Sequence, residues 1–261
     1  MGALPRRASG AGADAPGGGN LARAAGSGQA ALPPGLPRRL APAGRSGKNA
    51  GVDLTALYAR RAGSFDLVCE LYRLCGVRLR HYRRLAVATL DLAPGARVAD
   101  LGCGTGLAFG RLERAVGAAG EVDGVDRTAA MLARARRRIA RRGWTNVRLV
   151  EADLAEWRPA APLDGAISVL ALGLAPDLER AVANVATALR PGGRLAVVDL
   201  RIPDRVPRPI VDFGIRINRP FGIERDLVER PLFSILRRHL REVETRRFFA
   251  GGVELFVGER R

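Results

Sequence analysis

Through the middle of the chain, short apolar runs alternate with longer amphipathic segments, a pattern typical of a parallel sheet covered by helices. The predicted strands span residues 98–101, 121–126, 147–150, 166–172 and 194–200. Helices are expected over 128–139 and 178–189. Two later apolar runs, 243–249 and 253–257, are separated by Ala250-Gly251-Gly252 and predict a closing antiparallel hairpin. Together these elements predict an α/β, Rossmann-like, doubly wound sheet of seven strands, mainly parallel.

The N-terminal region divides into a tail and a helical lead-in. Residues 1–50 are rich in Gly, Pro and Arg, lack aromatic side chains and contain Asp14 as their only acid. Such a segment cannot bury a core, so we expect it to be disordered; alternatively, translation begins near Val52. Residues 54–90 predict two or three helices leading into the sheet. The folded domain is therefore expected over 51–261.

The first predicted strand ends at Asp100 and runs directly into a glycine-rich turn. Glycines allow positive φ and a close ligand approach, and the following helix offers unpaired N–H groups. The spacing G-x-G-x-G differs from the G-x-G-x-x-G of dinucleotide sites, and a carboxylate before it would repel a pyrophosphate. A carboxylate suits an ammonium group, so we expect S-adenosylmethionine, bound by Asp100 and by the turn residues Gly102, Cys103, Gly104 and Gly106.

A second acidic strand end supports the same interpretation. Asp126 follows Gly106 by twenty positions, where a βαβ unit puts an acidic residue against a ribose diol. The alternative for Asp126 is a helix N-cap. Arg127 comes next and belongs to the same predicted site. Met131 lies one turn into the helix, where it faces either a purine or the core.

At these residues the chain resembles the class I S-adenosylmethionine-dependent methyltransferases. The resemblance implies that Asp153 accepts a hydrogen bond from the adenine amino group and that the Leu154 backbone N–H meets a ring nitrogen. It also implies a lid over the methionine end of the cofactor, with Tyr58 as candidate. The family's usual Tyr-Asp pair appears here as Phe65-Asp66. A helix-packing residue is the alternative for Tyr58.

From Tyr58 onward, including Gly143-Trp144-Thr145-Asn146-Val147, the chain resembles the branch near ubiquinone/menaquinone C-methyltransferases and bacterial phospholipid N-methyltransferases. Asp123 departs from that pattern, because the second strand is usually apolar there. The resemblance implies an enzyme that transfers a methyl group by in-line displacement to a small hydrophobic acceptor, lipid-like or quinone-like. The alternatives are a soluble small-molecule acceptor and a non-catalytic module that binds S-adenosylmethionine. No catalytic residue is assigned; His81, Tyr72 and Tyr82 are the candidate bases.

Composition argues against a nucleic-acid partner despite a formal net charge of +17. Lys48 is the only lysine, so the charge reflects arginine-rich composition and predicts a solvated basic surface. Aromatic residues make up only 5%, too few for a base-stacking platform. The fourth strand is not followed by the Asn/Asp-Pro-Pro-aromatic motif of enzymes that methylate planar amino groups. Cys69, Cys75 and Cys103 show no metal-ligand spacing, and we expect no metal and a reducing cytoplasm.

Residues 203–240 form an apolar and basic insertion, interpreted as a substrate cap. Its apolar positions Leu232, Ile235, Leu236 and Leu240 share one helical face, whereas Arg237, Arg238 and Arg241 lie off it. That pattern fits either a cap packed on its own domain or a peripheral contact with an anionic membrane. No apolar run reaches transmembrane length. A cytoplasmic protein is therefore expected, with contact at the membrane surface as the alternative.

Overall fold

The computed structural model describes residues 53–71, 73, 76–203, 206–219 and 222–261. The predictions for the tail over residues 1–50 lie outside the described residues. So do those for Tyr72 as a candidate base and for Cys75, and residues 204, 205, 220 and 221 of the predicted cap.

Seven strands within the described residues form one sheet with the order β3-β2-β1-β4-β5-β7-β6. The first five are parallel, and the last two form an antiparallel hairpin at one edge. Their bounds are β1 Arg97–Leu101, β2 Glu121–Asp126, β3 Val147–Glu151, β4 Leu163–Val169, β5 Leu189–Leu200, β6 Arg241–Phe248 and β7 Val253–Glu259. The predicted fold class is confirmed.

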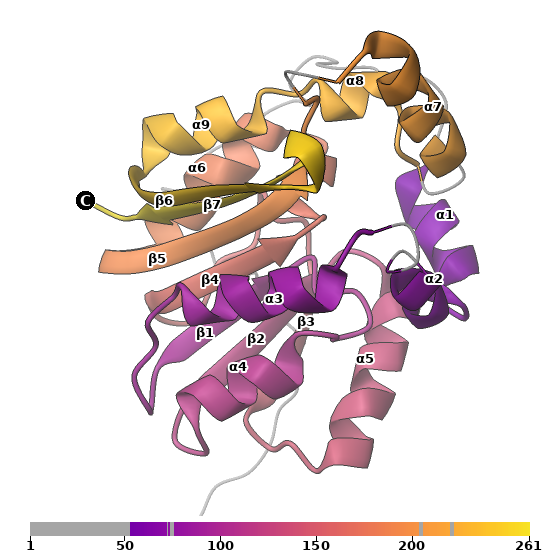
Figure 1. Ribbon diagram of the computed structural model, residues 1–261. Helices are drawn as coiled ribbons and strands as arrows, with labels where there is room; N and C mark the ends of the chain where they lie inside the picture. The colour runs from indigo at the N-terminus through magenta and orange to yellow at the C-terminus, as the bar shows by residue number, and fades with distance from the viewer. Residues whose placement is uncertain (1–52, 72, 74–75, 204–205, 220–221) are drawn as a thin grey trace, which may run out of the picture. The chain divides into compact units, whose positions relative to one another are not determined.

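Helices cover both faces of the sheet (Figure 1). One face packs against α3 (Leu79–Ala88), α4 (Phe109–Val116) and α5 (Ala129–Arg142). The other packs against α6 (Leu178–Ala188) and α9 (Leu232–His239). The remaining helical segments gather beyond one end of the sheet: α1 (Leu54–Arg61), α2 (Phe65–Leu71), α7 (Arg208–Asn218), α8 (Arg225–Val228) and the short turns η1 (Leu172–Leu174) and η3 (Phe249–Gly251).

Two strand boundaries differ from the prediction. The fourth strand was expected over 166–172 but is β4, Leu163–Val169, because Leu170 has φ +56° and Leu172 opens a 3-10 turn whose N–H donates to Ser168 Oγ (3.0 Å). The fifth strand begins at residue 189 rather than 194. Its first residue pairs with Leu163, and the Pro-Gly-Gly sequence is accommodated as an irregularity in the ladder.

The apolar face predicted for a cap or membrane helix is part of the core. In α9, Leu232, Ile235 and Leu236 are buried against the sheet and α6, and so is Leu240 after it. The neighbouring Arg237 donates to Glu242 (2.6 Å) and Glu254 (3.2 Å). Arg238 pairs with Glu179. The helix is thus packed on its own domain. Within residues 203–240, which are predicted to form a substrate cap, α7 and α8 contribute no buried side chain to the core and are termed the cap helices.

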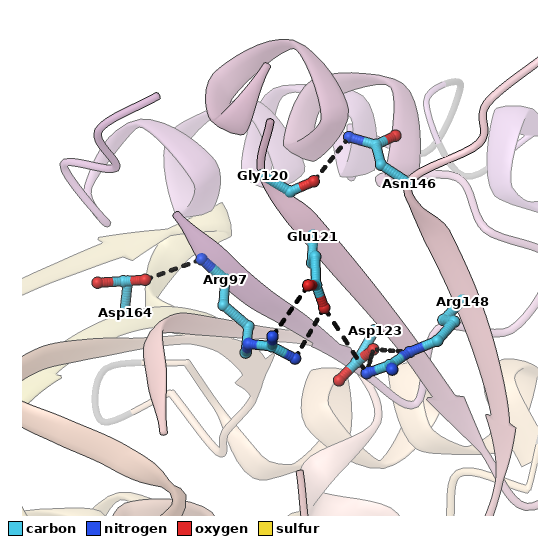
Figure 2. A network of polar contacts seen from close by, with 7 residues as sticks. All are labelled: Arg97, Gly120, Glu121, Asp123, Asn146, Arg148 and Asp164. Carbon is cyan, nitrogen blue, oxygen red and sulfur yellow. Dashed lines mark hydrogen bonds and ion pairs between the residues drawn. The ribbon is translucent and has the colours of Figure 1, made fainter. Parts of the chain in front are cut away.

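The buried Asp123 is explained by a polar network near the amino ends of the strands (Figure 2). Arg148 on β3 donates to Asp123 Oδ1 (2.8 Å) and lies 3.9 Å from Glu121. Glu121 in turn pairs with Arg97 on β1 (2.7 Å), and the Arg97 backbone N–H donates to Asp164 on β4 (2.8 Å). These contacts connect four neighbouring strands at the edge opposite the glycine turn.

Because Leu236 is fully buried, we expect Leu236→Ala to lower the free energy of unfolding by about 2 to 5 kcal/mol, through lost transfer energy and the cavity left behind. Urea denaturation measures this. Leu67→Ala, at a side chain 63% exposed, is the matched control and should change stability by less than about 0.5 kcal/mol. Equal effects of the two substitutions would contradict the placement of α9 in the core.

Candidate functional site

A cavity of about 560 Å³ lies at the carboxyl ends of the parallel strands. Ten of the eleven residues predicted to bind the cofactor line it; the exception is Gly106. The ten are Tyr58, Asp100, Gly102, Cys103, Gly104, Asp126, Arg127, Met131, Asp153 and Leu154. Residues that were separated by almost a hundred positions in the sequence therefore meet in one site.

The three glycines of the turn have different surroundings: two are tightly packed and one faces open space. Gly102, Gly104 and Gly106 all have positive φ, between 55° and 76°. A Cβ at Gly102 would lie 2.3 Å from Ala171 Cβ, and one at Gly106 would lie 2.5 Å from the ring of Phe109. Gly104 has only a Phe65 ring atom at 3.9 Å. Gly104 thus faces the cavity, whereas Gly106 is required by packing.

Asp100 carries a carboxyl group that is buried in the cavity wall. Its side chain lines the cavity from the end of β1 and the residue is 4% exposed. Among the described residues none donates a hydrogen bond to it; Arg83 and Asp126 act on it only through their charge. Burial raises the pKa of Asp100 to about 7. The site therefore fits a ligand that brings a cation to this carboxylate, such as an α-ammonium group.

Asp126, at the end of β2, is held by the backbone and is not the helix N-cap. Its Oδ2 accepts from the Gly104 N–H (2.8 Å) and its Oδ1 from the Thr128 N–H (2.8 Å). Thr128 itself is the N-cap of α5. Burial raises the pKa of Asp126, against the lowering effect of these hydrogen bonds. Each oxygen has a second lone pair that these bonds leave unused, and Asp126 lines the cavity, so the carboxylate has the capacity to accept from two hydroxyl groups.

The other predicted residues on this side have different surroundings. Met131 is 2% exposed and lies in the cavity wall. Asp153 follows β3, and its Oδ1 accepts from the Ala155 N–H (2.9 Å). Arg127 is turned to the lead-in helix, where its Nε and Nη2 donate to Thr55 Oγ1 (2.8 and 2.5 Å). Its guanidinium therefore connects α1 to the end of β2.

The lead-in helices cover the glycine turn through polar contacts. Asp66 on α2 accepts from Thr105 Oγ1 (2.5 Å) and pairs with Arg138 on α5. Tyr58 on α1 packs edge-on against Phe65, with 6.1 Å between ring centroids, and both line the cavity. The candidate lid is thus attached to the turn that it covers.

The candidate bases in α3 lie outside the cavity. Tyr82 is 3% exposed and packs against Phe248, with 5.1 Å between ring centroids. His81 Nδ1 lies 3.1 Å from a guanidinium nitrogen of Arg84. The pKa of His81 is lowered mainly by desolvation and further by the positive charges of Arg84 and Arg78. Neither residue lines the cavity.

Sequence reasoning missed two buried side chains that line the same cavity. Asp199 on β5 accepts from the backbone N–H groups of Gly173 (3.1 Å) and Leu200 (2.8 Å), and burial raises its pKa to about 6. Arg83 on α3 is 9% exposed. The rule that identified Asp100 and Asp126, an acidic residue near a strand end, also selects Asp199. No sequence signal marks Arg83.

Arg230, which follows α8, also lines the cavity and connects the cap helices to the segment after β4 by hydrogen bonds. Its Nη1 donates to the backbone oxygens of Gly173 (2.8 Å) and Ala175 (2.7 Å). Beyond it the wall is apolar, with Leu170, Leu174, Val211, Ile215, Ile223 and Leu227. The cavity thus has a polar half at β1–β3 and a largely apolar half at β4, β5 and the cap.

Comparison with known proteins agrees with the fold and the glycine turn. Residues 98–193 match the family model described as "Methyltransferase domain". The chain is 38% identical over 151 residues to the demethylmenaquinone methyltransferase of Thermus thermophilus, covering 57% of this chain and 66% of that protein. It is 33% identical over 156 residues to the 2-phytyl-1,4-naphtoquinone methyltransferase of Synechococcus elongatus, covering 54% and 64%.

Among solved structures, the fold resembles that of the N-methyltransferase NodS from Bradyrhizobium japonicum in complex with S-adenosyl-L-homocysteine. The TM-score is 0.57 at 18% identity, covering 80% of this chain and 99% of that one. The chain spans less than two thirds of the length of the two curated relatives named above. In the part of the chain that the structure describes, no helix is long and apolar enough to cross a bilayer.

The buried Asp100 predicts a specific pH dependence of stability. Its carboxyl keeps its proton up to about pH 7 in the fold but loses it near 3.8 when unfolded, so stability falls as pH rises through this window. Asp100→Asn removes that loss. The free energy of unfolding of the variant, compared with that of the wild type, should therefore rise by about 2 to 3 kcal/mol as the pH increases from 5 to 8.

Urea denaturation of the ligand-free protein at each pH measures the effect. Asp91→Asn, at a side chain 85% exposed, is the control and should follow the wild type at every pH. A constant difference between Asp100→Asn and the wild type across the range would show that Asp100 is ionised throughout.

Proposed function

Because residues 98–193 form a class I methyltransferase domain, we propose that the protein is an S-adenosylmethionine-dependent methyltransferase. The observation that carries the proposal is the Asp100 carboxylate, which is buried in the cavity with no donor among the described residues. A buried charge without a partner is costly, and an ammonium group would remove that cost. A dinucleotide would instead bring a phosphate to the same position.

Each residue of the polar half would bind a different group of the cofactor. Asp100 would hold the ammonium group, and the neighbouring Arg83 is the cation available for the carboxylate. Asp126 would accept from the ribose hydroxyls. Asp153 and the Leu154 backbone N–H would bind the adenine edge, with Met131 against its face. When bound, the cofactor supplies an electrophilic methyl group on a sulfonium centre.

The apolar half of the cavity supports a hydrophobic acceptor. Its wall carries Val211 and Ile215 from α7, Leu227 from α8 and Leu170 after β4. The relatives whose names specify a quinone substrate are consistent with a lipid-like or quinone-like acceptor. One alternative is a soluble small-molecule acceptor. The other is a non-catalytic module that binds the cofactor without transferring its methyl group. An assay with labelled methyl groups distinguishes all three.

Asp199 is the polar side chain best suited to the acceptor. It lies two strands away from Asp100 in the sheet, about 10 Å sideways, with β4 between them. Two backbone N–H groups fix its carboxylate, which stays mostly ionised at neutral pH with a pKa of about 6. Asp199 would therefore accept the proton that an acceptor hydroxyl releases while the apolar wall excludes water.

The ribose assignment predicts that Asp126→Ala weakens binding of S-adenosylhomocysteine about ten- to a hundredfold, through loss of charge-assisted hydrogen bonds. Calorimetry on the folded variant measures the affinity. Glu156→Ala removes an exposed carboxylate outside the cavity and should leave the affinity unchanged. Unchanged affinity in Asp126→Ala would refute the assignment, and no binding by the wild type would refute the proposed cofactor.

The acceptor assignment predicts a separation of effects in Asp199→Asn. The variant should bind S-adenosylhomocysteine within about twofold of the wild type, whereas methyl transfer should fall at least about tenfold, since removal of a proton acceptor costs rate and not cofactor affinity. Transfer is measured with labelled S-adenosylmethionine against reduced naphthoquinones, soluble phenols and soluble amines. Equal losses of binding and transfer would contradict a role confined to the acceptor.

A further inference from the structure

The cap helix α7 exposes large apolar side chains to solvent. Ile210 is 60% exposed, Phe213 64% and Ile217 52%. Their spacing of three and four residues sets them in one strip along the helix. No side chain of α7 is buried. Residues of this size are rarely grouped on an exposed strip unless the surface contacts an apolar partner.

The same helix forms part of the cavity wall. Val211, Gly214, Ile215 and Asn218 line the cavity, and Ile210 both lines it and is exposed. Because Ile210 lies at the border between these two faces, an apolar surface continues from the outer strip to the interior. Such a continuous apolar surface is the kind of path that a hydrophobic molecule would need to pass from the outside to the cavity.

The charge beside the strip is positive. Arg208 and Arg216 lie on α7, and within the described residues neither has an acidic partner. The helix's only acid, Asp212, is neutralised by Arg225 of α8. The surface is therefore apolar and cationic, which is the combination that anionic lipid headgroups and acyl chains recognise.

We propose that α7 is an interfacial helix that lies on anionic lipid membranes with Phe213 and Ile217 inserted, and that it delivers a lipid-soluble acceptor to the cavity. The delivery rests on the proposed methyltransferase function, whereas the contact with lipid does not. Figure 1 shows α7 next to α8, outside the helix layers that cover the sheet and away from α3, α4 and α5. In α9, by contrast, Arg237 and Arg238 are paired and the apolar face is buried.

Sedimentation of the full chain with phosphatidylglycerol/phosphatidylcholine vesicles tests the contact. We expect binding at low salt that weakens with added salt and with omission of phosphatidylglycerol. The double variant Phe213→Ser/Ile217→Ser should bind at least tenfold more weakly. Leu67→Ser/Leu71→Ser, which changes two exposed leucines of α2, is the control for exposed apolar area and should bind as the wild type does.

Charge is tested in the same way. Arg208→Gln/Arg216→Gln should weaken binding and flatten its salt dependence, whereas Arg136→Gln/Arg137→Gln on the exposed side of α5 should change it much less. Absence of binding at low salt, or equal effects of the α7 and control variants, overturns the proposal. A concentration-dependent dimer that the Phe213/Ile217 variant abolishes would assign the strip to a second copy instead.

Binding of S-adenosylhomocysteine, measured on the same proteins, separates the two proposals. Vesicle binding without cofactor binding would refute the methyltransferase function and leave the lipid surface in place. Cofactor binding without vesicle binding would refute the lipid surface alone.

Discussion

The site depends on the packing of one aromatic ring. Phe109, the first residue of α4, is fully buried, and its ring fills the space that side chains at Gly106 and Gly124 would need. A Cβ at Gly106 would lie 2.5 Å from a ring atom of Phe109, and a Cβ at Gly124 would lie 2.4 Å from one. The ring thereby fixes the glycine turn against β2. Strand pairing then sets Asp100 opposite Gly124. This contact and the β1–β2 pairing together hold the glycine turn beside the acidic ends of both strands.

The fold treats its buried carboxylates in two ways. Glu254 is surrounded by Arg201, Arg237 and Arg247, and Asp123 is paired with Arg148, so these groups are compensated within the protein. The carboxylates of Asp100, Asp126 and Asp199 in the cavity form no ion pair of this kind with the described residues: Asp126 and Asp199 accept from backbone N–H groups, and Asp100 accepts no hydrogen bond. An uncompensated buried charge lowers stability unless a proton or a cation neutralises it, so the carboxylates in the cavity are the ones that a cationic ligand would stabilise.

Much of the polar half was predictable, because acidic residues at the ends of parallel strands must share an edge of the sheet. The α9 helix shows the limit of that reasoning. Helical periodicity identifies an apolar face but does not say what covers it, so Leu232 and Leu236 fit a cap, a membrane or a core equally well. The contacts of Asp66 with Thr105 and Arg138 join segments far apart in sequence, and no local pattern encodes them.

The cap differs from the rest of the domain in what stabilises it. Short helices in water depend on tertiary packing, yet α7 has no fully buried side chain. Arg230, after α8, connects this part of the chain to the sheet by donating to the backbone oxygens of Gly173 and Ala175. An acceptor in the cavity and a lipid surface over Phe213, as proposed above, would supply the apolar packing that α7 lacks. A helix stabilised from both sides would link capture of the acceptor to the reaction site.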